Sequence, residues 1–358
     1  MGKLMLPKVV IIILNWNGWE DTVECLESLY QIDYPDYEVI LVDNGSTNSS
    51  IRQIKEYANG MINTKSNYCT YDSSNKPIKV LEYSEEEIEL SHSYGKWTKS
   101  SFGRKLIILK NKKNYGFSEG NNIGIRFALK NINFRYILLL NNDTVVEKNF
   151  LYELVITGEK SQENGIIGSK ILYYYNPSII QFNGKCINYK NLFLSRYTHP
   201  KKTAHGCESN TVKGCSMLIK KNVIKNIGAL DPDYFAYGEE EDYCIRAMRA
   251  GYKIIYSPTS KVYHKGGGST GGGFNKITAF LRIRNIILLY RKNFPLLHLL
   301  LLIPYLVTFI IYHTIFAMIA RKYIVINSMI KGLLWHVGSI KKNNYSLGLD
   351  ERYLQKLK

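Results

Sequence analysis

The first 60 residues alternate between apolar runs and amphipathic segments, and this rhythm restricts the fold more than any other feature of the chain. Residues 9–14 form an unbroken run of Val, Ile and Leu, which is typical of a parallel strand buried on both faces. A helical stripe follows over Trp19–Gln31, then a second strand over Glu38–Val42 and a second helix over Asn48–Tyr57. This βαβα order predicts a doubly wound α/β sheet.

A less regular segment separates this opening from the rest of the chain. Residues 61–105 are rich in Ser, Asn, Lys and Tyr, and we expect a surface insertion with one short helix near Glu85–Leu90. The alternation then resumes, and residues 184–211 are expected to form a loop. The remaining predictions are strands at 106–109, 136–140, 166–169, 171–175, 179–183, 212–220, 254–256 and 261–263, and helices at 118–130, 149–163, 221–227 and 239–250.

Polar side chains follow four of the predicted strands. Ligands of open α/β sheets bind at the carboxyl ends of their strands. Asn, Asp, Gly and Ser also form ordinary turns, but four such ends together favour a site that binds hydrogen-bonding groups and a cation. The four ends are Asn15-Trp16-Asn17, Asp43-Asn44-Gly45-Ser46, Asn114-Tyr115-Gly116-Phe117 and Asn142-Asp143.

Several other site classes lack their motifs. No G-x-G-x-x-G follows the first strand and no G-x-x-x-x-G-K-[ST] occurs, which disfavours the usual nicotinamide site and P-loop chemistry. The six cysteines form no C-x-x-C pair, so neither a zinc site nor a disulfide framework is expected.

Four adjacent acids, Glu239 to Asp242, begin one of the predicted helices. Acids stabilise a first helical turn through the macrodipole, and Asp242 has Arg246 four residues further on as an ion-pair partner. Mutual repulsion would raise the pKa of one carboxylate, which suits a general base. His264, just before the run Gly266–Gly273, is either a structural histidine or a metal ligand.

Five segments of the chain, in this order, match motifs of one enzyme family. The chain resembles the family 2 glycosyltransferases, nucleotide-sugar-dependent enzymes with the GT-A fold, and within them the rhamnosyltransferase-like branch. The resemblance spans Val9–Asn285 and is interrupted by residues 61–105. The segments are VIIILNWNG (10–18), LVDNGST (41–47), NYGFSEGNN (114–122), LLNNDT (139–144) and YGEEEDYC (237–244).

This resemblance implies a site for the donor nucleotide sugar. It implies that Asp43 hydrogen-bonds the nucleotide base and that Asn15 and Asn17 line the same pocket, with Asn44 and Ser46 at its edge. Asn141 replaces the first acid of the family's DXD-type motif, which implies a role toward the ribose. The other implied donor-binding residues are Asn114, Gly116, Asn121 and Asn142.

The resemblance also implies a metal ion and a base. Asp143 and His264 would hold Mg²⁺ or Mn²⁺ against the donor diphosphate, and Glu239 aligns best with the catalytic base. Glu240 is the other candidate, because this chain has Glu-Glu-Glu-Asp where relatives usually have Glu-Asp-x-Asp. One metal and one base would support inversion at the anomeric carbon. The absence of a Q-x-x-R-W motif argues for addition of a single sugar.

The net charge of +17 is distributed unevenly. Residues 281–358 hold 12 of the Lys and Arg residues but only two acids, Asp350 and Glu351. The excess therefore lies around apolar stretches, where it suits anionic lipid headgroups better than nucleic acid.

An uncharged run dominates this basic region. Residues 296–320 carry no formal charge, and at about 1.5 Å per residue a straight helix of this length would span a hydrocarbon core of about 30 Å. A second apolar stretch, residues 323–340, contains Lys331. Three arrangements agree with this pattern: a hairpin of two membrane helices, a helix lying in the membrane interface, and a buried helical subdomain.

We therefore expect a GT-A domain over residues 1–275 and a helical, membrane-associated region over residues 276–358. The expected activity is inverting, metal-dependent transfer of one sugar from a nucleotide-sugar donor to a glycan or lipid-linked acceptor at the cytoplasmic face of a membrane. One alternative is a nucleotidyltransferase acting on sugar phosphates, although the turn after the first strand lacks the basic residue such enzymes need. The other is an inactive membrane-associated scaffold with the same fold.

Overall fold

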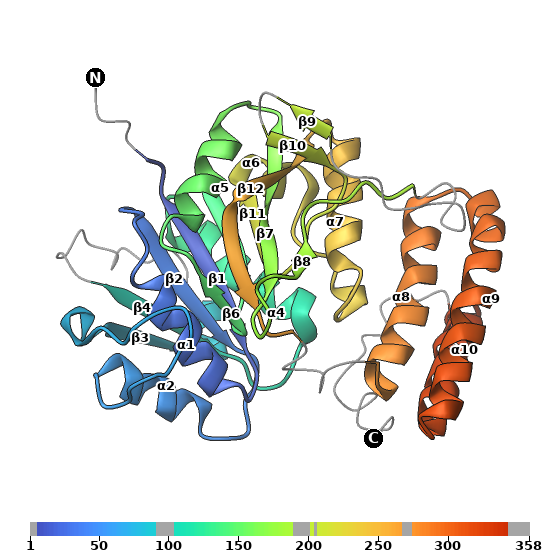
Figure 1. Ribbon diagram of the computed structural model, residues 1–358, viewed down its shortest axis with the longest axis horizontal. Helices are drawn as coiled ribbons and strands as arrows, with labels where there is room; N and C mark the ends of the chain where they lie inside the picture. Colours follow the sequence, from blue (N-terminus) through green and yellow to red (C-terminus); the bar gives the residue numbers. More distant parts are fainter. Residues whose placement is uncertain (1–5, 91–103, 189–200, 204–205, 267–273, 343–358) are drawn as a thin grey trace.

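The computed structural model describes residues 6–90, 104–188, 201–203, 206–266 and 274–342. These residues form one mixed sheet with helices on both faces and a bundle of helices at one side (Figure 1). In spatial order its strands are β3 (Lys79–Ser84), β4 (Lys105–Lys110), β2 (Tyr37–Asp43), β1 (Val9–Asn15), β5 (Tyr136–Asn141), β11 (Ser216–Lys220), β7 (Asn164–Tyr173), β12 (Lys253–His264), β10 (Gly206–Ser209) and β9 (Lys201–Thr203). Two short strands lie off this path, since β6 (Thr144–Val146) pairs with β12 and β8 (Ile180–Phe182) pairs with β7.

The five strands from β3 to β5 are parallel, which confirms the α/β prediction. The strand β11 runs antiparallel to both β5 and β7, while β12 runs parallel to β7. Parallel strands of this kind are buried on both faces, and the side chains of β1 divide between two hydrophobic clusters. Val9, Ile11 and Ile13 enter one cluster, while Val10 and Ile12 enter the other.

Helices cover the two faces of the sheet. On one face α1 (Trp19–Leu29), α2 (Ser50–Ala58) and α5 (Phe150–Glu159) contribute apolar residues to the first cluster. On the other face α4 (Gly116–Asn131), α6 (Lys221–Ile227) and α7 (Glu239–Arg249) contribute to the second. Because β1, β2 and β5 end at the same edge of the sheet, their polar carboxyl ends come together there.

The segment predicted as a surface insertion is more integrated than expected. Its residues 79–84 form β3, a parallel edge strand on β4, and the predicted short helix is present as α3 (Glu85–Leu90). A 3₁₀ turn, η1 (Ser73–Asn75), precedes β3, and the nearby Lys76 forms a buried 2.7 Å ion pair with Glu27 of α1. The prediction of an excursion from the sheet is therefore wrong for residues 79–84, because a half-exposed edge strand lacks the apolar run of a central one.

Three smaller predictions also differ from the structure. Residues 166–169 and 171–175 were predicted as two strands, yet β7 runs unbroken from Asn164 to Tyr173. The two short strands predicted at 254–256 and 261–263 are one strand, β12, with a shift in register between Ser257 and Lys261. The segment predicted as a loop at 184–211 contains β9 and β10.

The C-terminal region consists of α8 (Lys276–Asn293), α9 (Leu296–Ile319) and α10 (Tyr323–Lys342). A capping box starts α8, since Asn275 Oδ1 accepts from the Thr278 amide and the Thr278 hydroxyl accepts from the Asn275 amide. Side chains of α8 bind the α/β domain: Asn285 Nδ2 donates to the carbonyl of Ala236 over 2.7 Å, and Asn293 Nδ2 donates to Asp242 over 2.7 Å.

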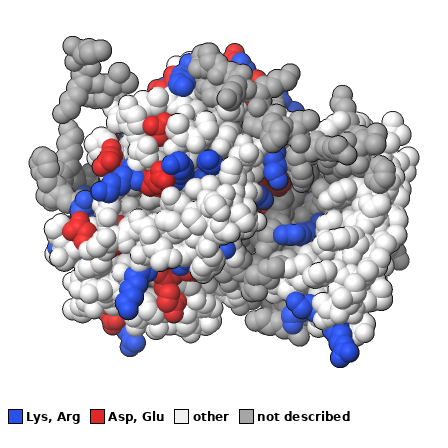
Figure 2. Space-filling model, viewed as in Figure 1, with Lys and Arg blue, Asp and Glu red and all other residues white. Residues whose placement is uncertain are grey.

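Among the described helices, α9 alone is long and apolar enough to cross a membrane. Only 6% of its most apolar 18-residue window is buried, so α9 is not the core of a buried subdomain. The surface over this helix is almost free of charged side chains (Figure 2). Large apolar side chains such as Leu300, Val307 and Ile311 are exposed along it.

Candidate active site

The predicted base-binding residues meet at the carboxyl ends of β1 and β2. Asn15 and Asp43 are register partners, and Asn15 Nδ2 donates to Asp43 Oδ1 over 2.7 Å. The Ser46 hydroxyl donates to the same oxygen over 2.6 Å, while the Ser46 amide donates to Asp43 Oδ2 over 3.1 Å. The backbone amide of Asn17 donates to Ser46 Oγ over 2.9 Å, so Asn17 contacts this group through Ser46. Asp43 is thus a buried side chain whose orientation is fixed by hydrogen bonds from Asn15 and Ser46.

A second group of predicted residues lies at the end of β2, in the loop before α4 and in the first turns of α4. Asn44 Nδ2 donates to Asn114 Oδ1 over 2.9 Å and to the Gly116 carbonyl over 3.0 Å, and the Gly116 amide donates to Asn114 Oδ1 over 2.8 Å. Gly116 has φ +81°, and a Cβ on it would lie 2.5 Å from the ring of Phe235, so only glycine fits there. Asn121 is buried and donates to the Phe117 carbonyl over 2.8 Å. These side chains shape the site's wall through contacts within the protein.

Asn141, Asn142 and Asp143 follow at the end of β5. Asn141 is half-buried, whereas Asn142 is buried and donates to the Gly18 carbonyl over 3.2 Å. The register of β6 with β12 then brings His264 beside Asp143, with His264 Nε2 at 3.2 Å from Asp143 Oδ1. The two predicted metal ligands therefore meet, although 121 residues of sequence separate them.

This pair fits a divalent cation in its donor set. A carboxylate oxygen and an imidazole nitrogen face one another, and the Gly266 amide donates to the other Asp143 oxygen over 3.2 Å. Among the described residues no cluster of three or more His, Cys, Asp or Glu side chains forms a protein metal cage. Mg²⁺ and Mn²⁺ in phosphate-transfer sites are typically held by one or two protein groups plus phosphate and water, so two ligands suffice for a cation shared with a diphosphate.

The acidic cluster at the start of α7 contains one carboxylate with unusual surroundings. Glu239 is buried, its Oε2 has no hydrogen-bond partner within the described residues, and its Oε1 faces Gly214. Burial, and next the charge of Glu240, raise the pKa of Glu239 well above its usual range. Burial and Glu240 likewise raise the pKa of Glu241 to about 8. Glu240 Oε2 accepts the Gly238 amide over 3.2 Å.

Asp242 in this cluster has a structural role. Its carboxylate accepts Arg246 Nε over 2.7 Å and Asn293 Nδ2 over 2.7 Å, so it joins α7 to α8. Charges from both groups act on the buried Cys215: burial, and next the charge of Asp143, raise the pKa of its thiol to about 12, and Glu240 adds to this shift. Asp143 and Glu240 are thus both close enough to act on the charge of one buried side chain.

Two residues near the site make contacts that the sequence did not predict. The Oε1 atom of Gln181, in β8, lies 2.7 Å from His264 Nδ1. Lys265 forms ion pairs with Asp21 (2.6 Å) and Glu24 (2.5 Å) of α1. The glycine-rich residues 267–273 lie outside the described residues.

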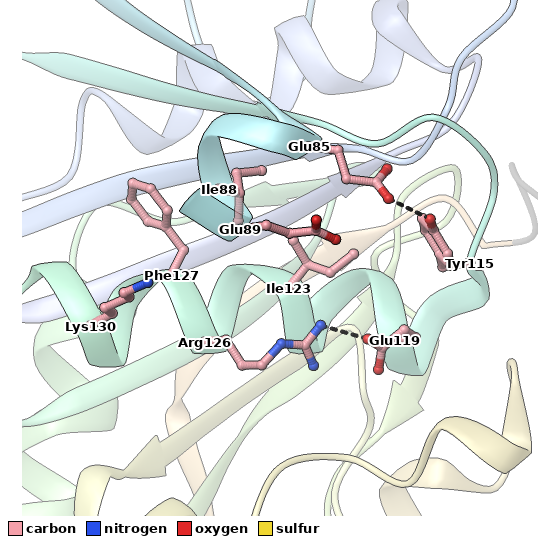
Figure 3. A pocket seen from close by; sticks show the side chains of 9 residues that line it. All are labelled: Glu85, Ile88, Glu89, Tyr115, Glu119, Ile123, Arg126, Phe127 and Lys130. Carbon is pink, nitrogen blue, oxygen red and sulfur yellow. Dashed lines mark hydrogen bonds and ion pairs between the residues drawn. The ribbon is translucent and has the colours of Figure 1, made fainter. Parts of the chain in front are cut away.

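A further cavity lies between α3 and α4 (Figure 3). It has a volume of about 430 Å³, and none of the residues that line it belongs to the predicted donor site. Tyr115 donates to Glu85 at its edge over 2.6 Å, and Glu119 pairs with Arg126 over 2.6 Å. Glu119 and Arg126 therefore bind each other, and the hydrogen bond from Tyr115 to Glu85 links the start of α4 to α3.

Comparison with known families gives two adjoining matches. Residues 10–77 match the family described as "Glycosyl transferase family 2", and residues 81–284 match "Glycosyltransferase like family 2". A curated protein of Haloferax volcanii, "Low-salt glycan biosynthesis hexosyltransferase Agl10", is 29% identical over 257 residues. That alignment covers 70% of this chain and 65% of the relative, so the chain spans slightly less than two thirds of the relative's length.

Solved structures agree with the fold. The mannosyltransferase PcManGT from Pyrobaculum calidifontis, solved with GDP-Man and Mn²⁺, aligns with a TM-score of 0.50 and 12% identity over 99% of this chain and 84% of its own. GalNAc-T7, solved with UDP, GalNAc and Mn²⁺, aligns with a TM-score of 0.53 and 16% identity over 79% of this chain and 48% of its own. At these identities the likeness concerns the fold, which is the GT-A fold.

Proposed function

Because the chain belongs to glycosyltransferase family 2, we propose that it transfers one hexosyl group from a nucleotide-sugar donor to a hydroxyl of a glycan or lipid-linked acceptor, with inversion and with the help of Mg²⁺ or Mn²⁺. That the protein is a glycosyltransferase follows from the family; the donor class, the metal and the stereochemistry are the proposal. The catalytic unit would be residues 1–275, with residues 276–358 as its membrane-associated region.

The observation that carries this proposal is the meeting of Asp143 and His264 at the edge of the sheet where β2 ends in Asp43. The two side chains face one another at 3.2 Å, and β5, whose end carries Asp143, is the immediate neighbour of β1, whose end carries Asn15. A carboxylate at the end of β2 and a cation-binding pair after β5, with only β1 between the two strands, match the two halves of a nucleoside diphosphate. This arrangement favours a nucleotide-linked donor over a sugar phosphate alone.

In this proposal each group of the site has one task. Asp43 accepts hydrogen bonds from the base, with Asn15, Asn17 and Ser46 holding its carboxylate in place. Asn141 approaches the ribose. Asp143 and His264 would hold the cation, which would offset the negative charge that develops on the leaving diphosphate.

The remaining step is a proton transfer. The acceptor oxygen forms a bond to the anomeric carbon as the bond from that carbon to the diphosphate breaks, and the hydroxyl proton passes to a carboxylate. Glu239 is the better candidate for this base, since its Oε2 is buried without a partner in the described structure and its pKa is raised. Glu240, which already accepts the Gly238 amide, is the second candidate.

The membrane association is also a proposal, supported by the exposed apolar face of α9. Lys292 and Asn293 join α8 to the α/β domain, α10 packs along α8, and α9 contacts both helices. A perpendicular span by α9 would carry these neighbours, with their charged side chains, into the bilayer. The arrangement therefore favours α9 lying in the interface, on the cytoplasmic face where basic residues meet anionic lipids.

The test is release of nucleoside diphosphate from a panel of nucleotide sugars, with and without Mn²⁺. We expect one donor to be cleaved in a metal-dependent way, and Asp143→Asn to lower this activity by about 100-fold, the scale of losing one preorganised charge-stabilising group. The matched control is Asp36→Asn, because Asp36 precedes the first residue of β2 and so lies at the edge of the sheet far from the strand ends that carry the site. Metal-independent activity, or full activity of Asp143→Asn, would refute the assignment of the site.

A further inference from the structure

The imidazole of His264 is held from both of its nitrogens. Its Nε2 lies 3.2 Å from Asp143 Oδ1, and its Nδ1 lies 2.7 Å from Gln181 Oε1. Gln181 belongs to β8, a three-residue strand that packs beside β7 and carries no other residue of the candidate site. The outer contact is therefore made by an element that carries none of the residues assigned to the donor, the metal or the base.

A β-bulge aims Gln181 at the histidine. Phe182 lies opposite Ile171 of β7, and Ile180 lies opposite Leu172, so Gln181 is the extra residue at a shift in register. Such a residue leaves the regular alternation of the strand, and bulges beside active sites commonly redirect a side chain. The strand β12, which carries His264, pairs with the same two residues of β7. The bulge and the histidine thus share one stretch of β7.

The orientation of the Gln181 amide agrees with this contact. Its Oε1 points to His264 Nδ1, and its Nε2 points toward Gly266, where a Cβ would lie 3.6 Å from that nitrogen. Because Oε1 is an acceptor only, the short contact requires that Nδ1 carry the hydrogen. With the hydrogen on Nδ1, Nε2 faces Asp143 Oδ1, where a proton or a cation lies between the two groups.

We propose that Gln181 is a positioning residue that fixes His264 as the Nδ1–H tautomer, so that Nε2 is ready to bind the cation shared with Asp143. This inference rests on the proposed metal-dependent function. A histidine can ligate a metal only through an unprotonated nitrogen, and the hydrogen bond at the other nitrogen sets both the tautomer and the ring orientation. A neutral amide does so without adding a second negative charge beside Asp143.

The tautomer can be observed directly in the metal-free protein. At about pH 8, above the usual range of histidine titration, long-range ¹H–¹⁵N spectra of the histidine-labelled protein distinguish a protonated from an unprotonated ring nitrogen. The signals of His264 are identified by their loss in His264→Asn. We expect Nδ1 to be protonated in the parent and in Gln181→Glu, and Gln181→Met to lose this preference. A Gln181→Met protein that retains the Nδ1–H tautomer would overturn the inference.

A second measurement links the tautomer to the metal. We expect Gln181→Met to weaken Mn²⁺ binding, followed by electron paramagnetic resonance in the presence of nucleoside diphosphate, by about 10-fold or more, as is usual when the partner of a metal-bound histidine is lost. Gln181→Glu keeps the acceptor and should restore most of the affinity. Gln162→Met, at an exposed glutamine, is the control for the substitution itself.

The outcomes separate this inference from the proposed function. If the parent binds Mn²⁺ and Gln181→Met binds it equally well, Gln181 does not position the ligand and the inference is wrong. If the parent binds no Mn²⁺ with any nucleoside diphosphate, the proposed metal site is wrong and the inference falls with it. Unchanged circular dichroism of Gln181→Met excludes unfolding as the source of a lost affinity.

Discussion

Asn15 and Asp43 face each other across neighbouring parallel strands, and Asn15 Nδ2 donates to Asp43 Oδ1 over 2.7 Å. The same oxygen accepts the Ser46 hydroxyl, so its orientation is set by two donors from different elements. The other carboxylate oxygen, Oδ2, accepts only the Ser46 amide among the contacts described, which leaves it acceptor capacity for a ligand.

The first prediction follows from this arrangement. Asp43→Ala should weaken binding of the donor nucleotide by about 10-fold or more, because a hydrogen bond to a charged group contributes roughly 1.5–3 kcal/mol. It should also destabilise the fold, since Asn15 and the Ser46 amide lose a buried acceptor. Titration calorimetry with the nucleoside diphosphate measures the first effect. The control is Asp36→Ala, which removes a half-exposed carboxylate paired with Lys8. Equal affinities of Asp43→Ala and the parent for the nucleoside diphosphate would contradict the prediction.

The second prediction distinguishes Glu239 from Glu240. Glu239→Gln should lower kcat by roughly 10²–10⁴-fold with little change in KM for the donor, as expected when a general base is removed. Glu240→Gln should lower kcat less, because Glu240 Oε2 already accepts the backbone amide of Gly238 and is therefore less available to take a proton from the acceptor. Steady-state kinetics on the cleaved donor decides between them. A larger loss for Glu240→Gln would assign the base to Glu240.

The third prediction concerns the pH dependence of stability without metal or donor. Burial and the charge of Glu240 raise the pKa of Glu241 to about 8, above the 4.5 of an unperturbed glutamate. A carboxyl whose pKa is raised by folding binds its proton more tightly in the folded state. Its contribution to stability is therefore complete below about pH 4.5 and is lost as the pH rises through about 8.

The measurement is the melting temperature between pH 5 and pH 9. Glu241→Gln removes the titrating group, so the fall in Tm of the parent over this range should exceed that of Glu241→Gln by at least about 2 °C. Glu163→Gln, at an exposed glutamate, should leave the pH dependence unchanged. Parallel curves for the parent and Glu241→Gln would show that Glu241 titrates normally.

The fourth prediction tests how much the ion pair between α1 and the segment before β3 contributes to the free energy of unfolding. Lys76 Nζ lies 2.7 Å from Glu27 Oε2, and both side chains are almost fully buried. Lys76→Met should lower the free energy of unfolding by about 3–5 kcal/mol, because it leaves Glu27 as an uncompensated buried charge. Adding Glu27→Gln should recover much of this loss. Lys55→Met, which removes an exposed pair with Glu82, should cost about 1 kcal/mol or less.

Chemical denaturation of the four proteins gives these differences directly. If Lys76→Met is as stable as Lys55→Met, the segment around Lys76 does not contribute to the folded core. If the double variant is no more stable than Lys76→Met, the loss comes from packing around the lysine stem and not from the charge.

The sequence predicted those parts of the fold that depend on local pattern. The aliphatic run of β1 and the polar ends of β1, β2 and β5 follow from residues close together in the chain. The edge strand β3 was missed because Lys79 and Glu82 interrupt its apolar residues, as an edge exposed to water allows. Gln181 was missed for another reason. Its contact with His264 joins residues 83 positions apart and depends on a β-bulge, and a local sequence pattern predicts neither the contact nor the bulge.

The last prediction concerns how α9 meets a membrane. Leu300, Val307 and Ile311 are each about half exposed, with fractions of 58%, 48% and 53%. Changing all three to Glu should lower binding to vesicles of phosphatidylcholine and phosphatidylglycerol by about 10-fold or more, because an interfacial helix binds through its buried apolar area. Placing Glu at Met61, Leu129 and Tyr175, which are exposed on the α/β domain, should change binding far less.

Extraction then separates lying in the interface from spanning. A helix that lies in the interface, with α8 and α10 packed along it, should be released from membranes by alkaline carbonate, whereas a spanning helix should resist it. Salt alone should release little of the protein, since the apolar contact does not depend on ionic strength. Protein that stays in the membrane after carbonate treatment would show that α9 separates from α8 and α10 and crosses the bilayer.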